Sequence, residues 1–255
     1  MRGLDGKVVI VTGAGGGIGA GTSARLASEG ATVVLTDLNL DAARTAAKEI
    51  TAAGGRAEPL ELDIGDADMV ATLIDDVAER HGRLDGLHNN AADLSESNLG
   101  RDGDLLEVPL EVWRRTIDVS LTGTMLCCRQ AIPHMLSGGG GAIVNTSSDA
   151  AFLGEPRFAA YSTAKAGMLA LTRHIASRWG KEGIRCNAIT PGLVLTDAAA
   201  ELVGQEWIAH QLAITRSTRL GRPSDIAAMV AMLMSDDGEW INGQTYAVNG
   251  GTTIR

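Results

Sequence analysis

The sequence predicts an α/β fold, in which a parallel sheet is covered by helices on both faces. Short apolar segments alternate with longer segments of helical pattern along the whole chain. The apolar segments are almost continuously apolar, which indicates strands buried on both faces. A glycine-rich stretch, TGAGGGIG, directly follows the first of them. Strict alternation of strand and helix implies right-handed βαβ units, and therefore a doubly wound parallel sheet.

The predicted elements follow from these patterns in order. The third helix has the clearest ends, because Asp66 is suited to N-capping and Gly82 to stopping the helix. Gly30 ends the first helix in the same way. Strands are predicted over residues 7–11, 31–37, 57–64, 84–91, 141–148, 184–192 and 244–251, and helices over 18–30, 40–55 and 66–82 and near 109–136, 160–180 and 224–234.

Two stretches, 92–108 and 193–222, fit the alternation poorly. Long irregular insertions in a compact domain are often lids or binding loops. Neither a composition shift nor a Pro/Ser-rich linker divides the chain. We therefore expect residues 1–255 to form a single domain, with a substrate lid near 193–222.

Composition excludes several classes of function. The formal net charge of −9 argues against nucleic acid or an anionic membrane as the main partner. The three cysteines and five histidines show no metal-ligand spacing, so we expect no metal site, and surface or capping roles for the histidines. The N-terminal apolar stretch is too short for a signal peptide, and no apolar run approaches the roughly 20 residues of a membrane span. A cytoplasmic location is expected.

The glycine-rich stretch lies between a predicted strand and a predicted helix, which a flexible linker would not do. Gly13, Gly17 and Gly19 give the spacing G-x-x-x-G-x-G. Free amide groups at a helix N-terminus attract phosphate, and glycine lets a pyrophosphate come close. The stretch lacks the Lys-Ser/Thr of a nucleotide-binding P-loop. The alternative is a tight turn without a ligand.

Carboxylates and short side chains end the next three predicted strands. Asp37 is placed to accept hydrogen bonds from both ribose hydroxyls of an adenosine and to repel a 2′-phosphate, which favours NAD over NADP. Asp63 could accept from the adenine amino group beside the Ile64 backbone. The NNAA segment (89–92) would let backbone lie along a cofactor. Each of these also fits ordinary turn or capping chemistry.

Tyr161 and Lys165 are four residues apart in the segment YSTAK, so they share one face of a predicted helix. An ammonium group beside a phenol lowers the phenol pKa, which suits proton exchange with an alcohol or a carbonyl group. Ser148, at the end of the fifth predicted strand, could donate to the same substrate oxygen, and Ser147 is a rival for that role. Chance i,i+4 packing on a surface is the alternative.

Taken in order, these segments resemble the short-chain dehydrogenase/reductase family. The match runs from TGAGGGIG through Asp37, LDIGD, NNAA, Ser148 and YSTAK to IRCNAITPG and INGQTYAVNGG. The resemblance implies a Rossmann-like sheet of seven strands, bound NAD(P), hydride transfer at the nicotinamide, Tyr161 as acid/base, and a homotetramer. The cofactor-binding residues that it implies are Gly13, Gly16, Gly17, Ile18, Gly19, Asp37, Leu38, Asp63, Ile64, Asn90, Ala91, Tyr161, Lys165, Pro191, Gly192, Val194 and Thr196.

The chain also departs from the family pattern. Ser120, in DVSLTG, stands where the family usually has an Asn that supports a proton-relaying water, so Ser120 is a further candidate catalytic residue. Asn249 stands where Asp is more usual. Gly15 and Gly16 occupy positions at which the family tolerates other small or basic residues, and an NADP-binding member often has a basic residue there.

The resulting hypothesis is an NAD-dependent oxidoreductase acting on a secondary alcohol or ketone. The alternative is a relative that binds NAD without turnover, as a sensor or structural protein. A mostly apolar, mid-sized substrate is plausible, although a sugar or an acyl thioester is also compatible with the sequence. The expected pocket walls contribute Phe152, Leu153, Phe158, Leu202, Trp207 and Leu212, beside Asp149 and Glu155.

Overall fold

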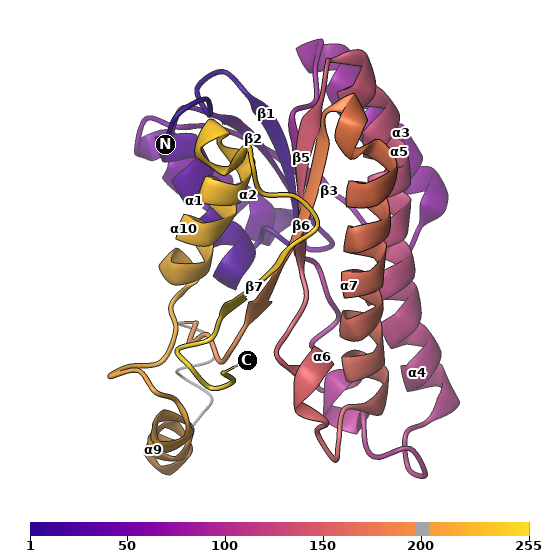
Figure 1. Ribbon diagram of the computed structural model, residues 1–255, viewed down its shortest axis with the longest axis vertical. Helices are drawn as coiled ribbons and strands as arrows, with labels where there is room; N and C mark the ends of the chain where they lie inside the picture. Colours follow the sequence, from indigo (N-terminus) through magenta and orange to yellow (C-terminus); the bar gives the residue numbers. More distant parts are fainter. Residues whose placement is uncertain (197–203, 255) are drawn as a thin grey trace.

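The computed structural model describes residues 1–196 and 204–254, and in them it contains a seven-stranded, all-parallel sheet (Figure 1). The strand order is β3-β2-β1-β4-β5-β6-β7, so the doubly wound α/β fold expected from the sequence is confirmed. The strands are β1 (Val8–Thr12), β2 (Thr32–Asp37), β3 (Arg56–Glu61), β4 (Gly86–Asn89), β5 (Gly141–Thr146), β6 (Ile184–Pro191) and β7 (Thr245–Val248).

Helices cover both faces of the sheet, and Figure 1 shows the sheet nearly edge-on between the two layers. One layer holds α1 (Gly17–Ser28), α2 (Leu40–Ala52) and α10 (Pro223–Met234). The other holds α3 (Ala67–His81), α5 (Thr124–Ser137) and α7 (Ala159–Trp179), with α4 (Leu110–Ile117) continuing beyond α5. The shorter elements are η1 (Leu99–Arg101), η2 (Asp118–Gly123), α6 (Ala150–Leu153), η3 (Gly180–Glu182), α9 (Gln205–Ile214) and η4 (Asp236–Gly238).

Each face of the sheet packs against its own apolar core. Alternate residues of a strand point to opposite faces, so Val9 and Val11 belong to the core under α1 and α10, whereas Val8 and Ile10 belong to the core under α3 and α5. The cysteines are buried in the second of these cores, and burial raises the pKa of Cys128 to about 12. These thiols are core residues without nucleophilic character.

Several details differ from the sequence-based expectations, and strands β3, β5 and β7 end two or three residues earlier than predicted. The predicted helix 109–136 is divided into α4, a π-helical segment (η2) and α5. Strand β4 ends at Asn89, two residues before the predicted end, because Asn90 and Ala91 turn away to contact the glycine loop. The surface or capping role expected for the histidines is wrong for His88, which lies in β4 with no exposed surface. Among the residues described, no helix combines the length and apolar character needed to span a bilayer.

Candidate active site

The glycine loop between β1 and α1 is a closely packed backbone turn. Gly13 has a φ of 64°, and a Cβ there would stand 2.7 Å from the Cα of Ala91. A Cβ on Gly19 would collide with the carbonyl oxygen of Gly13. Gly16, in contrast, has open space where a side chain would stand. The first and last glycines of the motif are therefore required by the packing of the loop itself.

Gly15 is closely packed in this chain, at a position where the family tolerates other residues. Its amide donates to Oδ2 of Asp37 at 2.8 Å. A Cβ on Gly15 would stand 2.8 Å from the Cβ of Ala42 and 2.9 Å from that carboxylate oxygen. Helix α2 therefore packs directly against the glycine loop, and a side chain at position 15 would require Ala42 or Asp37 to shift.

Asn90 supports the loop from the neighbouring strand. Its side-chain amide donates to the carbonyl oxygens of Thr12 at 3.1 Å and of Gly13 at 3.0 Å, and its backbone amide donates to the Thr12 hydroxyl at 3.0 Å. The amide of Ala91 donates to the same hydroxyl at 3.1 Å. The Asn90 side chain thus holds the loop in shape, while Ala91 lines the cavity beside it.

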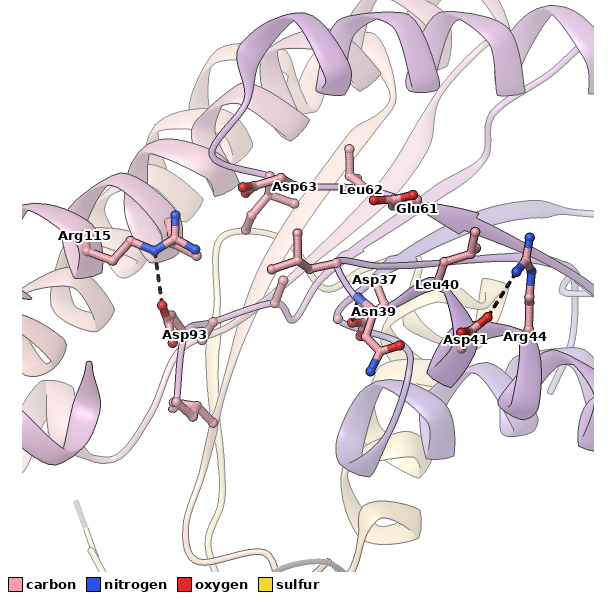
Figure 2. A pocket seen from close by; sticks show the side chains of 17 residues that line it. Asp37, Asn39, Leu40, Asp41, Arg44, Glu61, Leu62, Asp63, Asp93 and Arg115 are labelled. Atoms are coloured by element: carbon pink, nitrogen blue, oxygen red, sulfur yellow. Dashed lines mark hydrogen bonds and ion pairs between the residues drawn. The ribbon is translucent and has the colours of Figure 1, made fainter. Parts of the chain in front are cut away.

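That cavity, of about 700 Å³, lies at the carboxyl ends of β1 to β4 (Figure 2). In a doubly wound sheet this edge is where ligands bind, next to the point at which the strand order reverses. Six of the residues expected to bind the cofactor line the cavity together, namely Gly13, Asp37, Leu38, Asp63, Ile64 and Ala91.

The charges around this cavity are mostly negative. Its lining includes five carboxylates and two guanidinium groups, and Figure 2 shows each guanidinium turned to a carboxylate. Arg44 pairs with Asp41 at 3.0 Å, and Arg115 pairs with Asp93 at 3.1 Å. Burial opposes the shift, but hydrogen bonds from Ser95 and then Arg115 lower the pKa of Asp93. The Arg44–Asp41 pair is local, with its residues three apart on α2, whereas the Arg115–Asp93 pair joins residues 22 positions apart and is formed only in the fold.

Asp37 fits a ribose. Its two carboxylate oxygens accept one backbone amide each, from Gly15 at 2.8 Å and from Asn39 at 2.9 Å. A carboxylate can accept about four hydrogen bonds, so both oxygens keep capacity for hydroxyl donors. Gly16, which has open space above it, lies at the N-terminus of α1, where amide groups and the helix dipole favour phosphate. The residues present are therefore compatible with an adenine dinucleotide.

The second part of the site joins β5 to α7. Ser148 and Tyr161 are half-buried, and the Ser148 hydroxyl is hydrogen-bonded to the Tyr161 phenol. Ser147 faces a different way, because its buried hydroxyl donates to the backbone carbonyl of Lys165 at 2.7 Å. The structure therefore places Ser148, rather than Ser147, beside Tyr161.

Lys165 is fully buried below the tyrosine. Its Nζ lies 5.6 Å from the centre of the Tyr161 ring and donates to the backbone carbonyl of Thr146 at 2.8 Å. Burial lowers the pKa of Lys165 to about 8. Burial also raises the pKa of Tyr161, and the hydrogen bond from Ser148 only partly opposes this. The ammonium group lies near the ring while it is bonded to Thr146, and the lowering of the Tyr161 pKa by Lys165 stays a prediction.

Ser120 lies in the π-helical segment η2, and it is buried. Its backbone carbonyl accepts the Thr124 hydroxyl at 2.9 Å. On one side, a Cβ on Gly123 would stand 2.7 Å from the carbonyl oxygen of Ile64, and on the other, a Cβ on Gly167 would stand 2.8 Å from Leu121. The π-helical turn thus lies between the cavity and α7, and π-bulges are frequent at functional sites.

The remaining predicted residues follow β6. Gly192 packs against Asn249, and Val194 forms an isolated parallel bridge with Gly221. Thr196 approaches the glycine loop, since its Cγ2 lies 3.1 Å from where a Cβ on Gly17 would stand. Of the expected lid, residues 197–203, including Leu202, lie outside the described residues. In α9, Trp207 is 39% exposed, as expected of an open wall rather than a core helix.

The C-terminal segment also reaches this site. The side-chain amide of Asn249 donates to Oδ2 of Asp149 at 2.6 Å and to Oγ1 of Thr253 at 2.7 Å. The Thr253 hydroxyl donates to the same Asp149 oxygen at 3.1 Å, and Asp149 is 4% exposed. The replacement of the usual Asp by Asn249 therefore provides a donor to a buried carboxylate that directly follows Ser148.

Comparison with known proteins finds relatives that match nearly the whole chain. Residues 13–253 match a family model described as enoyl-(acyl carrier protein) reductase. A probable short-chain type dehydrogenase/reductase of Bradyrhizobium diazoefficiens is 42% identical over 252 residues, covering 98% of this chain and 89% of the relative. The cyclohexanol dehydrogenase of an Acinetobacter species is 36% identical over 253 residues, covering 99% and 97%. A solved 7α-hydroxysteroid dehydrogenase, complexed with NADH and 7-oxo glycochenodeoxycholic acid, has a TM-score of 0.90 at 34% identity and covers 98% of this chain and 95% of that one.

The fold and the site together define an α/β oxidoreductase with a Rossmann-like sheet. More narrowly, the chain belongs to the short-chain dehydrogenase/reductase family, because the family model and the relatives each match nearly its whole length.

Proposed function

We propose that this protein is an NAD-dependent oxidoreductase that interconverts a secondary alcohol and a ketone. The observation that carries the proposal is the position of Ser148 beside Tyr161, with Lys165 buried beneath them. Bound nicotinamide supplies the hydride acceptor or donor at its C4 atom. The chain has to supply the proton and hold the substrate oxygen, and these three side chains are suited to that task.

In this proposal the Tyr161 phenol exchanges a proton with the substrate oxygen, which also accepts a hydrogen bond from the Ser148 hydroxyl. Lys165 provides a positive charge below the phenol. Burial raises the pKa of Tyr161, so the phenol is protonated and ready to donate to a ketone. For alcohol oxidation Tyr161 must lose that proton, and a nearby ammonium group favours the phenolate.

NAD is favoured over NADP by the charges of the adenosine cavity. Asp37 stands at the end of β2 with capacity for two hydroxyl donors, and the two arginines of the lining are engaged by Asp41 and Asp93. A 2′-phosphate would meet these carboxylates at short range without an unpaired cation to neutralise it.

This cofactor preference is tested at Asp37. We expect Asp37→Ala to weaken NAD binding about tenfold and to raise the NADP/NAD ratio of kcat/KM about tenfold, because the repulsion is removed and Arg44 is close by. In the double variant Asp37→Ala/Arg44→Ala the gain for NADP should be largely lost. An unchanged cofactor ratio in Asp37→Ala would refute the role of this carboxylate.

Cyclic secondary alcohols are the proposed substrate class. Names of relatives support this, since one acts on cyclohexanol and another is complexed with a keto bile acid derivative. The described part of the chain supports it independently, because Phe152 and Leu153 follow Ser148 in α6 with 43% and 42% of their surface exposed. Exposed apolar side chains next to a polar site are suited to holding a hydrocarbon ring.

The test is turnover on a panel. NAD with cyclohexanol and sterol alcohols should give NADH absorbance at 340 nm, a known property of the cofactor, and Tyr161→Phe should lower kcat by a factor of about 10³ or more while NAD binding is kept. Tight NAD binding by the wild type with no turnover on the panel would instead favour the alternative, a sensor or structural protein.

We also propose a homotetramer, and sedimentation equilibrium distinguishes it from a monomer or dimer.

A further inference from the structure

Helix α7, which carries Tyr161, begins without a cap from its own sequence. Its N-cap residue, Phe158, makes no side-chain capping hydrogen bond. Phe158 has a φ of 65°, the one positive φ of a non-glycine residue in the described part of the chain. Tyr161 lies in the first turn, where the backbone amides have no partners within the helix. Something outside the helix must accept these amides and hold the strained residue in place.

Asp102 is that acceptor, and it lies far away in the sequence. Its Oδ1 accepts the amide of Ala160 at 3.1 Å, and its Oδ2 accepts the amide of Tyr161 at 2.8 Å. The Asp102 backbone carbonyl accepts the amide of Phe158 at 3.1 Å, and the neighbouring carbonyl of Gly103 accepts that of Ala159 at 3.3 Å. Two adjacent residues thus bind four consecutive amides at the start of the helix.

The carboxylate of Asp102 is enclosed by this arrangement. The residue has no exposed surface, although a charged side chain is rarely buried completely. Its negative charge lies at the N-terminus of α7, where the helix dipole stabilises an anion. A buried anion held by backbone amides fixes the position of those amides closely, since each partner would be costly to lose.

The loop that carries Asp102 is itself anchored near the cofactor cavity. The side-chain amide of Asn98 donates to the Thr116 hydroxyl at 3.0 Å and to the backbone carbonyl of Asp93 at 3.2 Å. Asp93 lines the cavity and pairs with Arg115. Residues 93–103 therefore connect the edge of the cavity to the first turn of the catalytic helix.

We propose that Asp102 is a positioning residue for the reaction: by binding the amides of Ala160 and Tyr161, it holds the Tyr161 phenol against the Ser148 hydroxyl. This inference rests on the proposed function, in which Tyr161 is the acid/base. It adds a requirement outside the trio of Ser148, Tyr161 and Lys165, on a loop that contributes no side chain to proton transfer.

The experiment compares Asp102→Ala and Asp102→Asn with a matched control, Asp66→Ala. Asp66 likewise accepts two amides at the start of a helix, those of Asp68 and Met69 in α3, but it is exposed and on another helix.

The chain has two tyrosines, so a Tyr246→Phe background labelled with ¹³C at the tyrosine ring gives a single NMR signal from Tyr161. This readout needs neither substrate nor turnover.

In Asp102→Ala we expect the Tyr161 signal to move and its pKa to rise, because the phenol loses the Ser148 hydrogen bond that lowers that pKa. The catalytic constant kcat should fall about tenfold or more, with the NAD dissociation constant changed less than about twofold. Asp102→Asn keeps one acceptor oxygen, so its Tyr161 pKa and its kcat should lie between those of the wild type and of Asp102→Ala. If Asp102→Ala does not fold, Asp102→Asn provides the test.

The opposite result is equally clear. If the Asp102 variants lose stability as Asp66→Ala does, but keep the Tyr161 signal, its pKa and kcat, then Asp102 is an ordinary cap and the inference is wrong. Failure of the proposed function looks different, because the wild type would then show no turnover on the panel, or Tyr161→Phe would keep its turnover, whatever the Asp102 variants do.

Discussion

Lys165 and His88 are two buried basic side chains that meet at one residue of β5. Lys165 Nζ donates to the Thr146 carbonyl at 2.8 Å, and Nε2 of His88 lies 2.8 Å from the Thr146 hydroxyl. Burial and, to a smaller extent, the charge of Lys165 lower the pKa of His88 to about 3. His88 is therefore neutral at physiological pH and acts as a hydrogen-bonding core residue, while Lys165 keeps the positive charge of this region.

The lowered pKa of Lys165 predicts a specific pH dependence of stability. The folded protein releases this proton near pH 8 and the unfolded chain near 10.5, so between these values the unfolded state binds more protons. The free energy of unfolding contributed by Lys165 therefore rises with pH in this range. We expect the difference in unfolding free energy between the wild type and Lys165→Met, measured with urea, to rise by about 2 kcal/mol from pH 8 to pH 10.5.

Lys48→Met is the control, because Lys48 is exposed on α2. It should leave the pH dependence of the wild type unchanged. If Lys165→Met has the same pH dependence as the wild type, then Lys165 is not held in the desolvated state that the structure indicates.

Among the elements, η2 explains how Ser120 can stand in place of the usual Asn. The helix between α4 and α5 widens into a π-turn at this point, and the turn packs between Ile64 and α7. This widening does not depend on an amide side chain. We propose that the Ser120 hydroxyl takes part in the proton relay that the family assigns to Asn.

The relay proposal predicts the kinetics of two variants. Ser120→Ala should lower kcat, by about tenfold, because it removes a hydroxyl and leaves the backbone of the turn intact. Ser120→Asn should be neutral or faster. The measurement is kcat across the pH range together with NAD affinity, and a wild-type kcat in Ser120→Ala would exclude the side chain from proton transfer.

The junction between β7 and the C-terminal segment predicts a charge-dependent effect. Asn249→Asp would place a second carboxylate beside Asp149, where the present donor lies 2.6 Å from Oδ2. Like charges this close are strongly unfavourable when partly buried. We expect a loss of about 2 kcal/mol in unfolding free energy, and a lower kcat because Asp149 adjoins Ser148.

A second variant adds Asp149→Asn to Asn249→Asp. It exchanges the two groups and should restore most of the stability. Absence of rescue would show that the pair is not the cause of the loss.

For the molecule as a whole, the parallel sheet could be predicted because every unit repeats the same alternation of buried strand and helix. The cavity residues could be predicted in part, because Asp37 ends a strand, Asp63 and Ala91 each follow one, and parallel strands end at one edge. The alternation of elements is periodic and the position of a residue at a strand end is local, so both can be predicted from a single sequence.

The remaining features depend on contacts between distant residues. Asp102 caps a helix that starts more than fifty residues later, and the sequence between them gives no sign of it. The close packing at Gly15 comes from Ala42 on the next helix, and the burial of His88 depends on its neighbours in the sheet. The Arg115–Asp93 pair and the π-turn likewise become visible only in the assembled fold.

The most direct test of the account follows the hydride itself. Cyclohexanol carrying deuterium on the carbinol carbon is incubated with NAD and the protein, and the NADH is examined by mass spectrometry and NMR. We predict deuterium at C4 of the NADH formed by the wild type, and none above background with Tyr161→Phe, which still binds NAD. Equal transfer by Tyr161→Phe, or failure of the wild type to transfer deuterium from any secondary alcohol of the panel, would contradict the account.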